Sequence, residues 1–243
     1  MSPASAALLD EKLVSLETNF FDDADSLARA LAGQVAADLK AGIALRGAAT
    51  LAVSGGSTPK KFFAALSRET LDWAKVTITL VDERWVDSSS DRSNAKLVSD
   101  LLLQNEAKAA AFISLWSGGD VPTPEAVAKT NANLAVLKLP FDAVILGMGN
   151  DGHTASFFPG GDTLHEALTN AGPALALNAQ GAGEPRITLT LPFLLNSKAI
   201  YLHIEGPEKA ATLDKAIAVG PIEDMPIRAV IRQTKVALSI YSC

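Results

Sequence analysis

The chain has 243 residues, of which 48% are hydrophobic and 20% charged, a composition typical of a globular protein with a sizeable core. Its net charge of −6 argues against a nucleic-acid-binding surface, and no apolar run reaches the length of about 18 residues that a membrane span needs. The single cysteine, Cys243, excludes an internal disulfide and fits a cytoplasmic location. The opening segment, residues 1–15, has no basic start, and acidic residues interrupt its apolar run, so we expect no signal peptide.

Strand-like and helix-like segments alternate along the chain. Short runs rich in β-branched residues predict strands over 50–54, 76–81, 141–146, 187–191, 199–204 and 236–241. Helical spacing occurs over 24–40, 59–66, 94–103, 124–137 and 207–218. This alternation predicts an α/β fold with a mostly parallel sheet covered on both faces, in a single domain over 1–243. Ligands of such sheets bind beyond the carboxyl ends of the strands, so the segments that directly follow the strands are the candidates for a binding site.

The first such segment is LAVSGGSTPKKF, residues 51–62. Two glycines and the start of a helix would turn backbone N–H groups inward, which predicts a cradle for an anion such as a phosphate. An ordinary strand–helix turn, with the Ser and Thr residues as helix caps, stays open as an alternative. The segment also comes close to the nucleophile elbow of serine hydrolases, with Ser54 as nucleophile, but Ala52 stands where that motif needs glycine.

The second segment, VDERWVDSSSDRSN, begins with Asp82, Glu83 and Arg84 at the end of a strand. Charged groups there can face a site without burial. The guanidinium of Arg84 suits forked hydrogen bonds to phosphate or carboxylate oxygens. The alternative is that the three residues form a solvated strand end.

The third segment, GMGNDGHTASFFPGG, contains a G-x-G-x-x-G pattern at residues 147–152. A dinucleotide-binding loop would lead into a long helix, but residues 159–161 (PGG) stop any helix within two turns. What remains is a glycine-rich turn that presents Asp151 and His153. Histidine titrates near neutral pH and suits a general base, although a lone histidine often has no such role.

Two further cations lie near the expected site. Arg186 precedes a predicted strand, and Lys209 lies in the first turn of a helix, where it opposes the helix dipole. A bound anion would explain that lysine, and a plain surface lysine is the alternative. The other histidines, His165 and His203, lie in a helical and a strand pattern, where we expect structural roles. No zinc-binding spacing of Cys or His occurs, so we expect no metal.

Taken together, the segments SGGSTP, VDERWV, GMGNDGHTASFFPG, RITLTLP and GPEKA resemble the lactone-hydrolysing branch of the glucosamine-6-phosphate isomerase/6-phosphogluconolactonase family. The resemblance runs in order from about residue 51 to about residue 215. It implies a three-layer α/β/α sandwich with a modified Rossmann-like sheet. It also implies hydrolysis of 6-phosphogluconolactone to 6-phosphogluconate in the pentose phosphate pathway, without a cofactor. The expected partner is the small sugar-phosphate lactone, bound by a monomer or weak homo-oligomer.

By position in the motifs, the resemblance makes His153 the general base and Asp151 the residue that orients or tunes it. It implies substrate contacts by Ser54, Gly55, Gly56, Ser57, Thr58, Asp82, Arg84, Arg186 and Lys209. The isomerase branch has Glu five residues after the motif histidine and D-E-Y in the second segment, where this chain has Phe158 and Arg84. Both departures favour the lactonase. An aldose–ketose isomerase or deaminase acting on a sugar phosphate is the alternative, and a sugar-phosphate sensor would need a DNA-binding helix-turn-helix for which we find no room.

Overall fold

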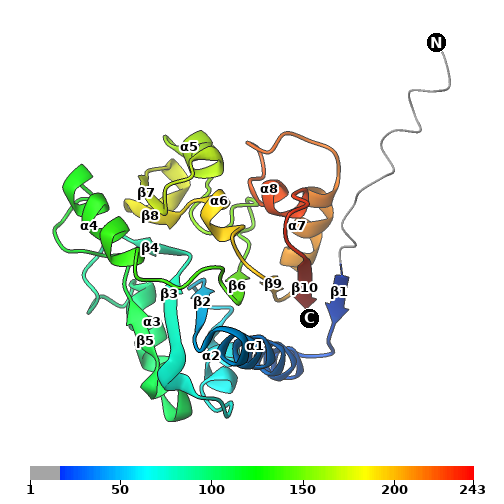
Figure 1. Ribbon diagram of the computed structural model, residues 1–243. Helices are drawn as coiled ribbons and strands as arrows, with labels where there is room; N and C mark the ends of the chain where they lie inside the picture. Colours follow the sequence, from blue (N-terminus) through cyan, green and yellow to red (C-terminus); the bar gives the residue numbers. More distant parts are fainter. Residues whose placement is uncertain (1–16) are drawn as a thin grey trace.

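The computed structural model describes residues 17–243, and the segment 1–15, for which we expect no signal peptide, lies outside them. The centre of the fold is a seven-stranded parallel sheet with the order β1-β10-β9-β6-β2-β3-β5 (Figure 1). Its strands are β1 (Glu17–Phe20), β2 (Ala49–Val53), β3 (Val76–Leu80), β5 (Ala111–Ile113), β6 (Ala143–Leu146), β9 (Ile200–Ile204) and β10 (Leu238–Ser242). The inner strands β2, β6 and β9 are buried along their whole length, as expected of a parallel sheet covered on both faces.

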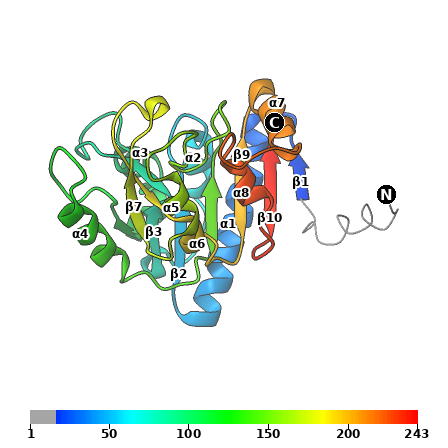
Figure 2. The same cartoon turned by 90° about the horizontal axis from the view of Figure 1, so that it is seen from above.

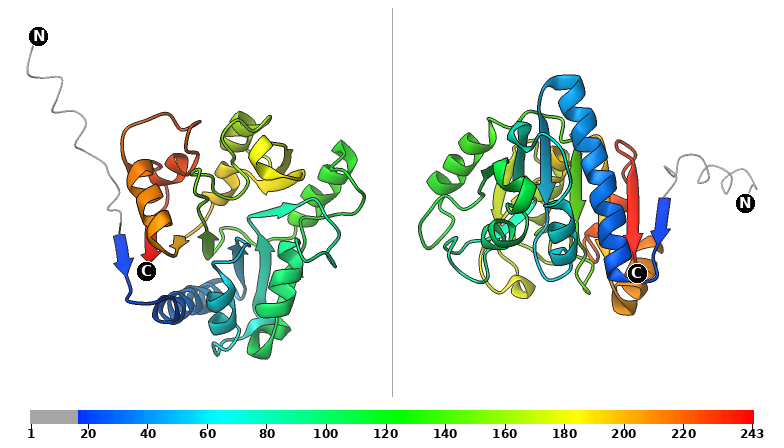
Figure 3. Two further views of the ribbon diagram at one scale, coloured as in Figure 1. Left: turned by 180° about the vertical axis from the view of Figure 1, so that it is seen from behind. Right: turned by 90° about the horizontal axis from the view of Figure 1, so that it is seen from below.

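Helices cover both faces of this sheet. One face carries α1, α2 and α3, while α5, α6, α7 and α8 lie on the other (Figures 1 and 3). The helices are α1 (Ala24–Arg46), α2 (Lys60–Leu66), α3 (Asn94–Leu101), α4 (Pro124–Leu134), α5 (Leu164–Thr169), α6 (Leu191–Leu194), α7 (Pro207–Ile217) and α8 (Ile227–Ile231). Short 3-10 turns occupy Trp73–Lys75, Asn105–Ala109 and Gln180–Ala182. The predicted α/β/α architecture with a mostly parallel sheet is therefore confirmed.

A second, smaller sheet departs from the prediction. It has three antiparallel strands, β4 (Asp82–Arg84), β8 (Arg186–Leu189) and β7 (Ala174–Leu177), in the order β4-β8-β7. The segment 187–191, predicted as a strand of the parallel sheet, forms β8 here. The small sheet lies on the same side of the large one as α5 and α6, as Figure 2 shows from above. It carries three predicted site residues, Asp82, Arg84 and Arg186, and the two arginines lie opposite each other in its register.

The core is a cluster of buried apolar side chains on both faces of the large sheet, and many of its fully buried members are phenylalanines and leucines of α1, α2, β2 and β3. Across residues 17–243, no helix combines the length and apolar character needed to cross a bilayer.

Candidate active site

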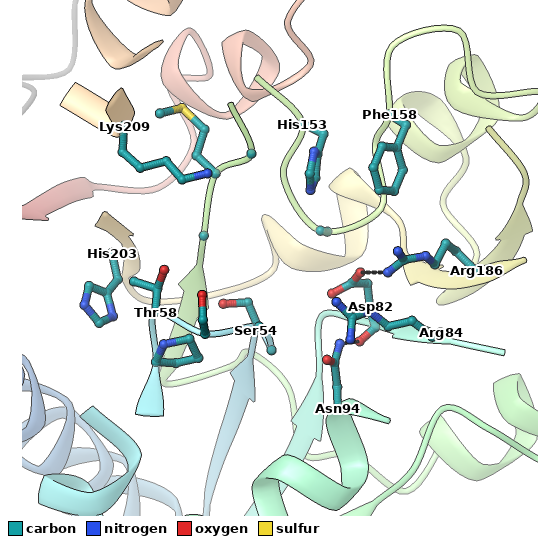
Figure 4. A pocket seen from close by; sticks show the side chains of 18 of the residues that line it. Ser54, Thr58, Asp82, Arg84, Asn94, His153, Phe158, Arg186, His203 and Lys209 are labelled. Carbon is teal, nitrogen blue, oxygen red and sulfur yellow. Dashed lines mark hydrogen bonds and ion pairs between the residues drawn. The ribbon is translucent and has the colours of Figure 1, made fainter. Parts of the chain in front are cut away.

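A pocket of about 280 Å³ opens at the carboxyl ends of the central parallel strands (Figure 4). Segments that follow β2, β3 and β6 line it, together with the start of β8, the end of β9 and the first turn of α7. The predicted site residues that line it are Ser54, Gly55, Gly56, Ser57, Thr58, Asp82, Arg84, His153, Arg186 and Lys209. Asp151 does not line the pocket itself, but its carboxylate is hydrogen-bonded to His153, which does. The fold thus brings together segments that are separated by as many as 155 residues, from Ser54 to Lys209.

The third predicted segment builds a histidine–aspartate dyad. The apolar strand β6 ends at Leu146, and a tight turn follows, in which the N–H of Gly149 donates to the His153 carbonyl at 2.8 Å. Nδ1 of His153 lies 2.6 Å from Oδ1 of Asp151, whose other contact in the dyad is the His153 backbone N–H at 3.1 Å. Because an ionised carboxylate only accepts, Nδ1 carries the hydrogen and Nε2 is left free to take a proton.

The dyad depends on a glycine at position 149. A Cβ placed there would overlap Nδ1 of His153 and Oδ1 of Asp151, so only glycine lets the backbone pass this close to the pair. Burial alone would raise the pKa of Asp151, but the hydrogen bonds and the charge of His153 outweigh it and lower that pKa. The carboxylate therefore stays ionised beside the imidazole, and Figure 4 shows the ring of His153 directed into the pocket.

The loop 54–58 forms the floor of the pocket beside Asn94. Gly55 lies so close to that side chain that a Cβ would overlap its Oδ1. Within residues 17–243, the backbone N–H groups of Gly55 to Thr58 donate to no backbone carbonyl, so they remain available to a ligand. The alternative reading of Ser57 and Thr58 as ordinary helix caps is wrong, because α2 follows Pro59 without a side-chain cap.

The nucleophile reading of Ser54 also lacks geometric support. In the described part of the chain, the imidazole of His153 is hydrogen-bonded to Asp151, and no hydrogen bond joins it to the Ser54 hydroxyl. A serine nucleophile needs such a bond to a base.

A buried charge pair forms another wall. Asp82 and Arg186 are only 6% and 7% exposed, and their nearest charged atoms lie 3.9 Å apart. Oδ2 of Asp82 accepts from the Ser156 hydroxyl at 2.6 Å, while Arg186 donates to the Ala182 carbonyl at 2.7 Å. Burial lowers the pKa of Arg186, and the charge of Asp82 opposes that shift. The alternative of a solvated strand end is therefore wrong for Asp82, which lies buried in the small sheet against the loop after β6.

The alternative of a solvated strand end is wrong for Glu83 as well, because this side chain is fully buried. Its carboxylate accepts four hydrogen bonds of 2.8 to 3.0 Å, from the backbone N–H groups of Arg84, Asn94 and Ala95 and from the Ser93 hydroxyl. Two of these donors are the first N–H groups of α3, which have no partner inside the helix. Burial nevertheless raises the pKa of Glu83. This residue holds the second segment in place from behind the pocket.

The remaining predicted cations, Arg84 and Lys209, reach the pocket from opposite sides (Figure 4). Arg84 donates from Nη1 to the Arg92 carbonyl at 2.7 Å, and within residues 17–243 its Nε has no hydrogen-bond partner. Lys209 lies in the first turn of α7 as predicted. Burial lowers its pKa, and the negative charges of Asp151 and Glu208 oppose that shift. The pocket therefore combines a histidine, three cations and the backbone N–H groups of the loop 54–58, a set that suits an anionic substrate.

Comparison with known proteins shows which family the chain belongs to. The family model for glucosamine-6-phosphate isomerases/6-phosphogluconolactonase matches residues 22–239. The chain belongs to this family. It is 50% identical over 231 residues to a 6-phosphogluconolactonase of Rhizobium meliloti, covering 94% of this chain and 99% of the relative. A crystal structure of a 6-phosphogluconolactonase from Shewanella baltica superposes with a TM-score of 0.89 at 42% identity, covering 96% of this chain and all of that one.

The fold by itself does not separate the two branches of the family. A monomeric glucosamine-6-phosphate deaminase shares it, with a TM-score of 0.74 at 21% identity over 93% of this chain and 97% of the deaminase. The choice between lactone hydrolysis and isomerisation must rest on the side chains of the pocket.

Among the pocket residues that were not predicted as substrate contacts or given a catalytic role, three have polar or aromatic side chains. Asn94 begins α3, and only its place after a capping serine marks it in the sequence. Phe158 lies beside His153, hidden in an apolar run. His203, predicted to be structural, lies in β9 but lines the pocket, with Nε2 3.0 Å from Oε1 of Glu205. Between residues 17 and 243, no group of three or more His, Cys, Asp or Glu side chains is placed to hold a metal ion.

Proposed function

We propose that this family member is a 6-phosphogluconolactonase, which hydrolyses 6-phosphogluconolactone to 6-phosphogluconate in the cytoplasmic pentose phosphate pathway. The observation that carries the proposal is the His153–Asp151 dyad, with its 2.6 Å contact, in the wall of a pocket lined by Arg84, Arg186 and Lys209. A base beside cationic groups suits the hydrolysis of a neutral lactone that carries a phosphate. The names of the relatives support the same assignment.

In the proposed mechanism, Nε2 of His153 takes a proton from water as the water oxygen attacks the lactone carbonyl carbon. Asp151 holds the ring through Nδ1 and stabilises the imidazolium that forms. The tetrahedral intermediate then expels the ring oxygen, which receives the proton from His153. The carboxylic acid product ionises at neutral pH, so each turnover consumes one water and releases one proton to the solution.

The cations divide between the phosphate and the carbonyl oxygen, which carries negative charge in the intermediate. We assign the phosphate to the loop 54–58 and Lys209, because free backbone N–H groups and an ammonium together suit a dianion. Arg84 and Arg186, next to Asp82, then lie on the side of the carbonyl. Within this proposal, Ser54 lines the loop and does not attack the substrate.

Proton release measured in a pH-stat tests the proposal. With freshly prepared 6-phosphogluconolactone, we expect the protein to accelerate the release of one proton per lactone far above the spontaneous rate. The enzyme-free reaction under identical conditions is the control. With glucosamine 6-phosphate, we expect neither ammonia nor fructose 6-phosphate. Release of ammonia from glucosamine 6-phosphate, or no acceleration with the lactone, would overturn the proposal in favour of the isomerase branch or of another substrate.

A further inference from the structure

Phe158 contacts both the dyad histidine and a buried cation of the pocket. Its ring lies nearly parallel to the imidazole of His153, with 4.2 Å between the ring centroids and 28° between the planes. The guanidinium carbon of Arg186 lies 5.4 Å from the centroid of the same ring. Figure 4 shows the ring next to His153, with Arg186 nearby. The mechanism above gives Phe158 no role.

The ring of Phe158 is itself held firmly. It is 3% exposed and packs with Leu177 and Ala182 in a small apolar cluster apart from the main core. Its backbone is fixed at both polar groups, because its N–H donates to the Ser156 carbonyl and its carbonyl accepts from the Gly161 N–H, each at 3.0 Å. The aromatic face is therefore a fixed wall against which another group can be oriented.

The hydrogen bond to Asp151 alone does not fix the orientation of the His153 ring. The bond from Nδ1 to Asp151 fixes one atom of the imidazole but leaves the ring able to rotate about that contact, and the side chain is 29% exposed on the pocket side. A contact over the ring face removes this rotation and directs Nε2 into the pocket. Aromatic faces also attract cations, so the same contact favours the imidazolium that forms when His153 takes a proton.

We propose that Phe158 is a positioning residue for His153, which fixes the plane of the imidazole and stabilises its protonated form during lactone opening. The inference rests on the proposed role of His153 as the base. Because the contact acts through the histidine and not on the substrate, it should govern kcat and leave KM nearly unchanged.

Two substitutions at the same position separate this role from simple packing. Phe158→Leu keeps an apolar side chain but removes the aromatic face, and we expect kcat to fall about tenfold with KM changed by less than about twofold. Phe158→Tyr keeps the face, and its kcat should stay within about threefold of the wild type. The control is Leu39→Ala, a fully buried core residue of α1 outside the pocket, which lowers stability and should leave kcat within about threefold.

Proton NMR of the His153 ring gives a readout that does not depend on activity. The signals, assigned by their loss in His153→Ala, should be shifted by the ring current of Phe158 in the wild type and in Phe158→Tyr, and should move in Phe158→Leu. Equal kcat losses in the Leu and Tyr variants, an unchanged kcat in Phe158→Leu, or an effect on KM alone would overturn the inference. If the wild type opens no lactone, the proposed function fails, while the NMR comparison still decides whether Phe158 orients His153.

Discussion

Glu83 and Asp151 are two carboxylates of the segments that follow β3 and β6, the strands on either side of β2, and they differ in burial and in their partners. Glu83 is fully buried and accepts four hydrogen bonds, whereas the Asp151 side chain is 44% exposed and bonds His153. Burial raises the pKa of Glu83, while the contacts with His153 lower that of Asp151 against a smaller degree of burial. Glu83 thus holds the pocket wall in place, and Asp151 lies beside the proposed base.

In the proposed mechanism, exposure and partner identity separate the functional carboxylate, Asp151, from Glu83, which serves the structure. Glu83 satisfies the first N–H groups of α3 and leaves no lone pair directed at the pocket. Asp151 adds little to the fold, because pairs at this exposure contribute about 0–1 kcal/mol. If this division holds, the exposed side of the pocket carries the chemistry and the buried side contributes to stability.

The largest effect should come from the exposed side. His153→Ala should lower kcat by about 10²–10⁴, the usual contribution of a positioned general base, with a smaller change in KM. Steady-state kinetics on 6-phosphogluconolactone measures this, and His165→Ala, an exposed histidine of α5, is the matched control with unchanged kcat. A folded His153→Ala protein that keeps more than about a third of the wild-type kcat shows that His153 is not the base.

Lys209→Ala tests which of the pocket cations binds the phosphate of the substrate. A charge-assisted contact contributes about 1.5–3 kcal/mol, so kcat/KM for the phosphorylated lactone should fall about 10- to 100-fold, mainly through KM. The rate with plain gluconolactone should barely change. Both lactones are measured at one ionic strength, with Lys215→Ala in the exposed last turn of α7 as control. Equal losses on the two lactones would place Lys209 at the carbonyl instead of the phosphate.

Ser54→Ala should have a small effect, because water is the proposed nucleophile. We expect kcat within about threefold of the wild type, whereas loss of a serine nucleophile costs on the order of 10⁶. Labelling of Ser54 by a fluorophosphonate, or a burst of acyl-enzyme, would move the chemistry to that hydroxyl.

Treatment with EDTA should have no effect on kcat, since the proposed reaction uses only side chains of the pocket. The measurement compares activity before and after chelation and dialysis. Inactivation that an added divalent metal reverses would contradict a cofactor-free reaction.

Much of this arrangement could be predicted from the sequence. The apolar strands β2 and β6 and the glycines after them are local signals, and they placed the loop 54–58 and the dyad at one edge of the sheet. The second sheet could not be predicted, because β4 is three charged residues long and pairs with β8 about 100 residues later. The burial of Glu83 depends on that pairing and on α3, so its charge alone suggested a solvated strand end.

The positions of Phe158 and His203 in the pocket could not be predicted, for the same physical reason. Phe158 belongs to an apolar run that is indistinguishable from core sequence until the loop folds against His153. His203 occupies a fully buried strand, and only the position of the pocket at the end of β9 brings it near a ligand.

A paired measurement on Glu83→Gln and Asp151→Asn tests whether stability depends on the buried carboxylate and catalysis on the exposed one. For each variant, the free energy of unfolding in urea and the kcat of the folded protein are determined side by side. Glu83→Gln should lower the free energy of unfolding by about 2–4 kcal/mol, because an amide nitrogen then faces buried N–H donors, while most of kcat is kept. Asp151→Asn should change stability by less than about 1 kcal/mol and lower kcat at least about tenfold. Asp151→Asn with full kcat, or a loss of stability there as large as in Glu83→Gln, would contradict the division between the exposed and the buried carboxylate.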